Sequence, residues 1–245
     1  VKTGQPESGY FVALDDRRLK TPAKRDIDLP TQALATALAE EWDAQDEEIL
    51  PASMPVMRLV ATAIDRVGDA LDATVASFVD YAGSDMLLYR AEAPPKLVKH
   101  QDEKWSPVLA WAKGRLNLDF TVTSGVLPVD QPADNAARLT KIAGRDVFRV
   151  SGLAHGAALL GSAILTLALE AGEISAERAH ALSNLDALFQ IDEWGADAEA
   201  MERLEQIALD IVDGTKAADR VFVQVCSQNG AFACRTLMSC SETFF

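Results

Sequence analysis

The chain contains few cysteines, few histidines and few aromatic residues. Among 245 residues there are three cysteines, three histidines and 7% aromatic residues. All the cysteines fall within the last twenty residues, so the first 225 residues cannot form a disulfide with one another. The histidines are isolated, and neither they nor the cysteines follow the spacing of zinc ligands. We therefore expect neither a metal ion nor a disulfide in the body of the protein.

Motifs that bind phosphate or carry out nucleophilic catalysis are also missing. The sequence has no G-x-x-x-x-G-K-[ST] loop, no G-x-G-x-x-G loop and no G-x-S-x-G elbow. The absence of any complete catalytic or phosphate-binding motif argues against an enzyme. Carboxylates are abundant, so one alternative stays open: a carboxylate-based hydrolase, or a small-molecule-binding enzyme, with its cleft between two domains.

Positive charge is scarce. The 37 acidic residues outnumber the 23 basic ones, which gives a formal net charge of −14 at pH 7. Binding to a nucleic-acid backbone requires cationic surface, so nucleic acid is excluded as a general partner. A cluster of basic residues does occur near the N-terminus: Arg17, Arg18, Lys20, Lys24 and Arg25. Such clusters more often protect an edge strand from pairing with another chain than form a binding site for a partner.

One run of twenty residues, 150–169, has no Asp, Glu, Lys or Arg and is long enough to span a bilayer. It contains three glycines and several polar residues, and it lacks flanking aromatic or basic clusters. We therefore predict one helix, buried on all sides within a helical bundle, and no stable membrane insertion.

The first fifty residues predict a small domain that contains both strands and a helix. Residues 10–14 and 17–21 form a candidate hairpin, and residues 26–29 a further extended segment. Thr31 is a candidate cap for a helix on which Leu34, Leu38 and Trp42 share a face. Two prolines at 51 and 55 resist a continuous helix, so we place a domain boundary after residue 50.

Residues 51–220 predict a larger, all-helical domain resembling an orthogonal bundle, so the fold class is α+β. The tail 221–245 differs, since it has only two charged residues and all the cysteines. It is either a docking strand or a non-native extension, and we assign it no function. The expected helices cover residues 57–67, 75–86, 97–116, 152–170, 175–189 and 201–211, with β-type composition at 120–129.

An acidic group surrounds Trp194 and Gly195. Glycine at 195 should end one helix, and acids in the first turn of the next helix would suit its dipole. That structural reading does not explain the tryptophan. A Trp194 exposed among carboxylates would suit a binding hot spot for a basic or amide-rich partner, whereas a buried Trp194 would belong to the core. The acids of the group are Asp192, Glu193, Asp197 and Glu199.

Ten short sequence blocks, which follow one another in a single order within residues 10–215, make the chain similar to a known family. It resembles the assembly chaperones of the ATP synthase catalytic head (F1-ATPase) that bind its alpha subunit. Two departures are Ser84, where the family usually has Thr, and His100, where Arg is expected. The blocks are 19–24 (LKTPAK), 29–31 (LPT), 40–45 (EEWDAQ), 54–55 (MP), 63–66 (AIDR), 81–85 (YAGSD), 89–92 (YRAE), 101 with 105–107 (Q, WSP), 190–195 (QIDEWG) and 197–200 (DAEA).

The resemblance implies a chaperone that binds the unassembled alpha subunit, prevents its aggregation and releases it to the beta subunit. It further implies a monomer without a cofactor, in the cytoplasm of a bacterium or the mitochondrial matrix of a eukaryote. For contact with the alpha subunit we favour Trp194 as the anchor, with Glu193, Asp197 and Glu199 as polar contacts. For four charged residues in the blocks we favour ion pairs that fasten the helices; these are Asp65, Arg66, Asp85 and Arg90.

Overall fold

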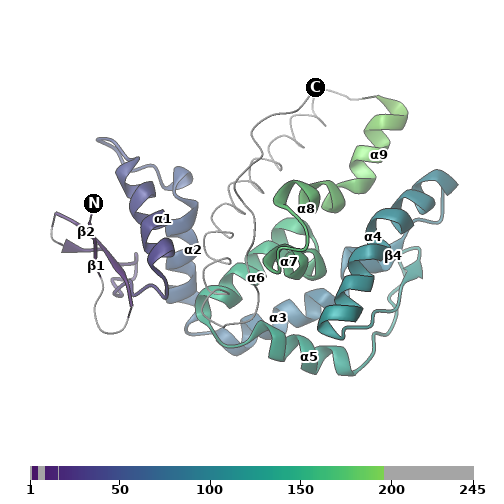
Figure 1. Cartoon of the computed structure of the whole chain (residues 1–245), viewed down its shortest axis with the longest axis horizontal. Helices are drawn as coiled ribbons and strands as arrows, with labels where there is room; N and C mark the ends of the chain where they lie inside the picture. The colour runs from purple at the N-terminus through teal and green to yellow at the C-terminus, as the bar shows by residue number, and fades with distance from the viewer. Residues whose placement is uncertain (1, 5–8, 16, 196–245) are drawn as a thin grey trace.

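The computed structural model describes residues 2–4, 9–15 and 17–195. In Figure 1 the N-terminal strands, α1 and α2 lie at one end of the molecule, and α3 to α9 form the helical body beside them. A small sheet followed by a helical body confirms the predicted α+β class.

The sheet has three antiparallel strands in the order β1-β2-β3. The predicted hairpin is confirmed, with Asp15 at its turn in a left-handed conformation (φ 45°). The return strand is shorter than predicted, and β1 was not predicted because three residues give too little pattern. The predicted extended segment 26–29 pairs with the sheet through single bridges, Lys20 to Asp26 and Tyr10 to Leu29. The strands are β1 (Lys2–Gly4), β2 (Phe11–Leu14) and β3 (Arg17–Arg18).

Helix α1 (Gln32–Asp43) covers the sheet and begins where the sequence predicts. The hydroxyl of Thr31 accepts a hydrogen bond from the N–H group of Leu34 (3.3 Å) and so caps the helix. Leu34 and Leu38 are completely buried in a smaller core, to which Phe148 of the helical body also contributes. Helix α2 (Pro55–Thr62) adds three residues to this core, and the division of the chain after residue 50 stays a prediction.

The helical body follows the predicted periodicity in most places. Helix α5 was not predicted, although it does have an apolar face: Leu139 and Ala143, one turn apart, are its buried apolar residues. The remaining elements are η1 (Pro51–Ser53), η2 (Ala63–Val67), α3 (Leu71–Gly83), η3 (Met86–Leu88), β4 (Tyr89–Arg90), α4 (Pro95–Leu116), β5 (Thr123–Ser124), α5 (Asp134–Ala143), α6 (Val147–Leu160), α7 (Ala163–Glu170), α8 (Ala176–Ser183) and α9 (Leu185–Trp194).

The prediction of one buried helix over 152–170 is wrong, because the segment forms two helices. Helix α6 ends at Gly161, whose φ of 65° is a left-handed conformation that glycine adopts without strain. The hydroxyl of Ser162 then accepts from the N–H group of Leu165 (2.9 Å) and caps α7. Within the described ranges, no helix is both long and apolar enough to cross a membrane.

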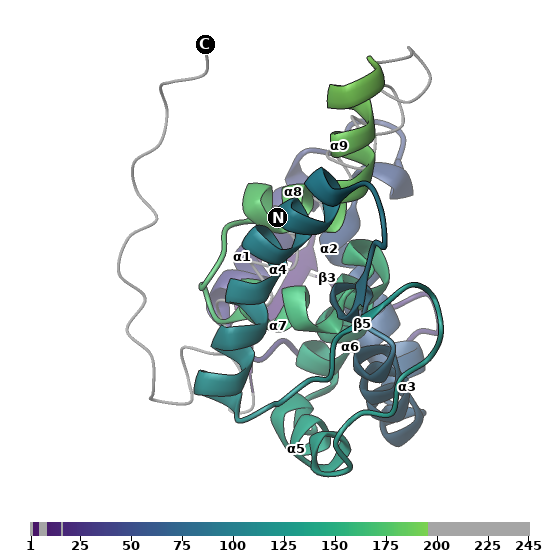
Figure 2. The same cartoon turned by 90° about the vertical axis from the view of Figure 1, so that its right-hand side faces the viewer.

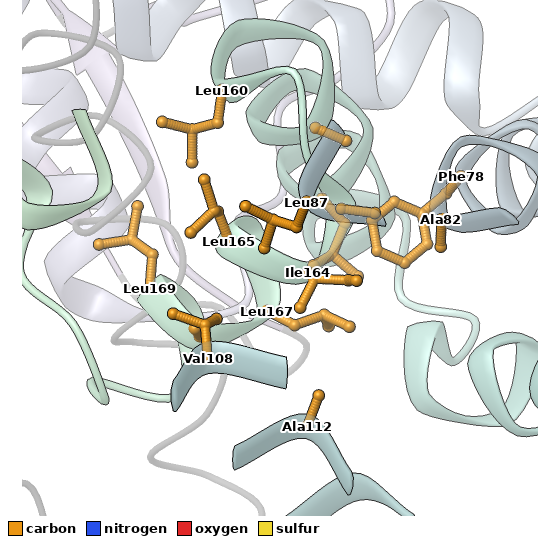
Figure 3. Close-up of a cluster of buried hydrophobic side chains, with 14 of the residues drawn as sticks. Phe78, Ala82, Leu87, Val108, Ala112, Leu160, Ile164, Leu165, Leu167 and Leu169 are labelled. Atoms are coloured by element: carbon orange, nitrogen blue, oxygen red, sulfur yellow. The ribbon is translucent and has the colours of Figure 1, made fainter. Parts of the chain in front are cut away.

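Helix α7 lies at the centre of the larger core, as the burial prediction required. Residues 163–169 are all buried. Figure 3 shows Ile164 and Leu167 among side chains from α3 and α4, including Phe78 and Val108. This helix therefore holds together elements that are distant in the sequence.

Two other predictions needed correction. The β-type region 120–129 forms only β5, which pairs in parallel with β4. The helix predicted over 175–189 starts at Ser175, whose hydroxyl accepts from the N–H group of Arg178, but it divides at Asn184 into α8 and α9. The predicted helix 201–211 and the tail 221–245 lie outside the described residues.

Candidate protein-binding surface

The predicted binding segment begins at the end of α9. As predicted, the helix stops at Gly195, which has a φ of 86° and donates its N–H to the carbonyl of Ile191 (2.8 Å). Of the four predicted contact residues, the structure describes the side chain of Glu193 alone. Asp197, Glu199 and the side chain of Trp194 lie outside the described part of the chain.

Glu193 is exposed and connects α9 to the beginning of α4. Its Oε1 atom lies 2.8 Å from Nζ of Lys96, and this hydrogen bond raises the pKa of the lysine. Water screens such an exposed pair, so it contributes little to stability and the carboxylate remains able to exchange partners. Asp192 is exposed beside it, which makes this end of α9 acidic.

Beneath this surface, Gln101 joins three elements and fixes the start of α9. Its Nε2 donates to the carboxylate of Asp186 in α9 (2.8 Å), and its Oε1 accepts from the N–H group of Ala91 (2.8 Å). The carbonyl of Gln101 accepts from the guanidinium of Arg90 (2.7 Å). Figure 2 shows α9 beside one end of α4, the arrangement that these contacts hold.

Among the described residues Arg90 has no ion-pair partner, contrary to the prediction. Its guanidinium instead donates to the Gln101 carbonyl and lies over the Trp105 ring, 5.0 Å from the centroid. Burial lowers the pKa of Arg90, while the charges of Asp102 and Asp186 oppose that shift. Trp105 in turn donates its indole N–H to the carbonyl of Leu182 at the end of α8 (3.0 Å). Two of the resemblance blocks, 89–92 and 101–107, therefore build the support for α8 and α9.

The ion-pair prediction is also wrong for Asp85, which is completely buried and accepts hydrogen bonds from neutral donors. Its Oδ2 accepts from the hydroxyl of Ser162 and the N–H group of Ile164 (2.9 Å each). Its Oδ1 accepts from the N–H group of Leu87 (3.1 Å). Burial raises the pKa of the Asp85 carboxyl to about 6 against the effect of these donors. Asp85 therefore fastens the start of α7, without a cation.

Asp65 does form an ion pair, but with the N-terminal region. Its carboxylate accepts from the hydroxyl of Thr21 (2.7 Å) and lies 3.9 Å from the guanidinium of Arg25. The contact joins the sheet region to η2 and does not fasten two helices. Arg66, the remaining residue of this prediction, is exposed.

Much of the N-terminal basic cluster is neutralised by nearby acids. Lys20 pairs with Asp26 (2.8 Å) and Arg25 with Asp69 (2.5 Å). Arg18 lies 2.5 Å from Asp28, which is in the adjoining extended segment. These pairs favour the structural reading of the cluster over a partner site.

Metal binding has no support in residues 2–4, 9–15 and 17–195. Within those ranges, no three His, Cys, Asp or Glu side chains gather in a way that could hold an ion. Sequence reasoning missed the most exposed apolar side chains of the described residues, Val126 and Leu127, at the tip of the connection between α4 and α5. The signal was a β-type composition, which was assigned to a strand.

Comparison with known proteins gives consistent matches. A family model described as ATP12 chaperone protein matches residues 1–113. The crystal structure of Atp12 from Paracoccus denitrificans is 39% identical in sequence, with a TM-score of 0.84 over 90% of this chain and 95% of that one. The Atu1473 protein of Agrobacterium tumefaciens is 37% identical, with a TM-score of 0.85 over 91% and 83% of the two chains. The mitochondrial protein atp12 of Schizosaccharomyces pombe is 24% identical over 207 residues, which are 78% of this chain and 70% of that protein.

Proposed function

Because the chain belongs to the ATP12 family of chaperones, we propose that it binds the unassembled alpha subunit of F1-ATPase and releases it to the beta subunit. Membership of this family confirms the general prediction that the chain is an ATP synthase assembly chaperone and not an enzyme. The hydrolase alternative therefore falls away. The specific proposal, binding of the alpha subunit and its release to the beta subunit, is supported by the structural similarity to Atp12 over nearly the whole chain.

The physical need for such a chaperone follows from the assembly of the ring. A subunit destined for an obligate oligomer exposes a large apolar interface before its neighbours arrive, and that surface promotes aggregation. Covering it requires no nucleotide, and a net charge of −14 keeps the carrier soluble while it holds an apolar client. Release requires only that the alpha–beta contact be stronger, since each ~1.4 kcal/mol shifts the ratio of complexes tenfold.

For the client-binding surface we propose the end of α9 and the residues after it, with Trp194 as anchor. Glu193, Asp197 and Glu199 would supply polar contacts to a basic or amide-rich patch. What supports this surface is the exposed acidic end of α9 and its firm attachment through Gln101 and Asp186. The part of the site that lies on α9, with Glu193, therefore loses little entropy when it binds.

We further propose that the chain acts as a monomer in a bacterial cytoplasm or a mitochondrial matrix. The relatives reported above come from two bacteria and from a yeast whose protein is named as mitochondrial. Both compartments contain an ATP synthase head that must be assembled, which agrees with this location.

The test is to follow light scattering of isolated alpha subunit with and without the chain, and to measure complex formation by size exclusion. We expect the wild-type chain to suppress scattering and to form a complex with the alpha subunit. Replacing Trp194→Ala together with Glu199→Gln should weaken that complex by at least about tenfold if these residues are a hot spot. Glu173→Gln removes an equivalent charge from the exposed turn between α7 and α8, and should have no effect. Full binding by the double variant would mean that the client docks elsewhere.

A further inference from the structure

A second surface stands out in the connection between α4 and α5. We refer to residues 121–131 as the 121–131 loop. Its tip is apolar and strongly exposed: 89% of Val126 and 76% of Leu127 is accessible to solvent, and Val122 is exposed as well. Large apolar side chains in adjacent positions at this exposure are typical of contact surfaces.

The base of the loop is closed by specific hydrogen bonds. The side-chain amide of Gln131 donates to the carbonyl of Thr121 (3.0 Å) and accepts from the N–H group of the same residue (2.9 Å). Gly125 donates its N–H to the carbonyl of Arg90 (2.9 Å) and has a φ of 80°, which a residue with a side chain rarely adopts. Next to it, β5 pairs with β4. The tip is therefore held in place by contacts on both sides.

A closed loop with an apolar tip is prepared for binding. Its backbone is already ordered, so a partner that accepts the tip has little conformational entropy left to remove. Val126 and Leu127 make no contribution to either buried core, so their apolar surface remains available to such a partner. A protruding tip of this kind fits a pocket on the partner.

The charges around the loop indicate what surrounds that pocket. No Lys or Arg occurs between residues 117 and 137, whereas Asp130 is exposed within the loop. The exposed Glu92 lies against Gly125, with its carboxylate 3.1 Å from the position that a Cβ atom there would take. An acidic rim around an apolar tip is complementary to an apolar pocket with basic residues at its edge.

The loop is connected to α9 by a short series of contacts. Arg90 holds Gly125 through its carbonyl, and its guanidinium donates to the carbonyl of Gln101. The side chain of Gln101 reaches Asp186 in the first turn of α9. The loop and the proposed α9 surface are therefore positioned by one hydrogen-bonded unit, so one partner can meet both in a fixed arrangement.

We infer that the 121–131 loop inserts Val126 and Leu127 into an apolar, basic-rimmed pocket on the unassembled alpha subunit. The inference rests on the proposed function, since it names the second surface by which that client is bound. It assigns to the loop the apolar part of the contact and leaves the acidic part to the end of α9.

The test uses the full chain with Val126→Asp and Leu127→Asp together, and measures its dissociation constant for isolated alpha subunit. Since both side chains are exposed, the variant should keep the circular dichroism and melting temperature of the wild type. Binding should weaken by about tenfold or more, as expected for the loss of a central anchor. The matched control is Ile49→Asp with Leu50→Asp, because these side chains are also exposed (55% and 58%) but follow α1 at the other end of the molecule, and it should bind normally.

The outcomes separate this inference from the proposed function. If the wild-type chain does not bind the alpha subunit, the proposed function is wrong. If the wild type binds and the loop variant binds equally well, or if loop and control variants weaken equally, the role of the loop is overturned. A loop variant that alters only self-association would also overturn it, because the tip would then contact a second copy of this chain. Gln131→Ala opens the base of the loop without touching the tip, and should weaken binding by a smaller factor.

Discussion

The substitution Asp85→Asn tests whether a buried carboxylate fastens the start of α7. Aspartate offers two acceptor oxygens, and here one accepts from Leu87 while the other accepts from Ser162 and Ile164. Asparagine has nearly the same shape but only one acceptor oxygen, since its nitrogen is a donor. Whichever way the amide is oriented, it faces one of the two backbone N–H groups with another donor.

The expected loss follows from that count. A buried donor left without an acceptor costs about 1–3 kcal/mol. Removing the charge from a completely buried site offsets part of this cost. We therefore expect Asp85→Asn to lower the free energy of unfolding by about 2 kcal/mol at pH 5, where the wild-type carboxyl is mostly protonated, and by about 1 kcal/mol at pH 7, where the wild type carries the buried charge that asparagine avoids.

Urea unfolding followed by circular dichroism measures this loss as a lower midpoint at an unchanged slope. The matched control is Asp80→Asn, an exposed aspartate on α3, which should change the free energy of unfolding by less than about 0.5 kcal/mol. If Asp85→Asn proves as stable as the wild type, the carboxylate does not hold α7 in the way described.

Three further predictions concern the pH dependence of stability and two other side-chain contacts. The pKa of Asp85 in the folded protein, about 6, exceeds its ordinary value of 3.8, so protonation of this carboxyl stabilises the folded state. This stabilisation is lost as the pH rises through 6. Between pH 5 and pH 7 the wild type should lose about 1 kcal/mol of stability from this group, measured by urea unfolding, and Asp85→Asn should not show that loss. Arg149→Lys should cost about 2 kcal/mol in the same assay, because Arg149 binds the Glu170 carboxylate with two nitrogens (2.5 and 2.8 Å) and a lysine cannot; an unchanged midpoint would refute this. Glu41→Gln should lower the melting temperature through a loss of about 1 kcal/mol, because the Glu41 carboxylate accepts from the N–H group of Val56 (2.7 Å) at the start of α2; equal melting would show that this cap is dispensable.

The sequence predicted those features of the fold that depend on neighbouring residues. Thr31 and Ser175 cap helices where expected, and Gly195 ends α9, because each signal acts on backbone groups within a few residues. The apolar repeats likewise located α3 and α4.

Features that depend on contacts between residues distant in the sequence could not be predicted from the sequence. The break at Gly161 falls in a run that is apolar throughout, and the start of α7 is secured in part by Asp85, 79 positions before Ile164. For the binding surface, the sequence identified the acidic end of α9. It gave no indication that Gln101 would support it through Asp186, 85 positions away.

The exposed tip of the 121–131 loop was missed for a related reason. Valine and leucine beside other β-branched residues favour a buried strand. Only the hydrogen bond from Gln131 to Thr121 and the pairing of β5 with β4 explain why the side chains of Val126 and Leu127 remain on the surface. Exposure is a property of the folded chain, so an apolar pair in sequence does not distinguish core from contact surface.

The most direct test of the account is an order-of-addition experiment without nucleotide. The chain is first bound to isolated alpha subunit, beta subunit is then added, and the products are separated by size exclusion. We expect alpha to elute with beta while the chain returns to its free position, because the alpha–beta contact is the stronger one. A chain that stays bound to alpha in the presence of excess beta, or that never bound alpha, would refute the proposed function.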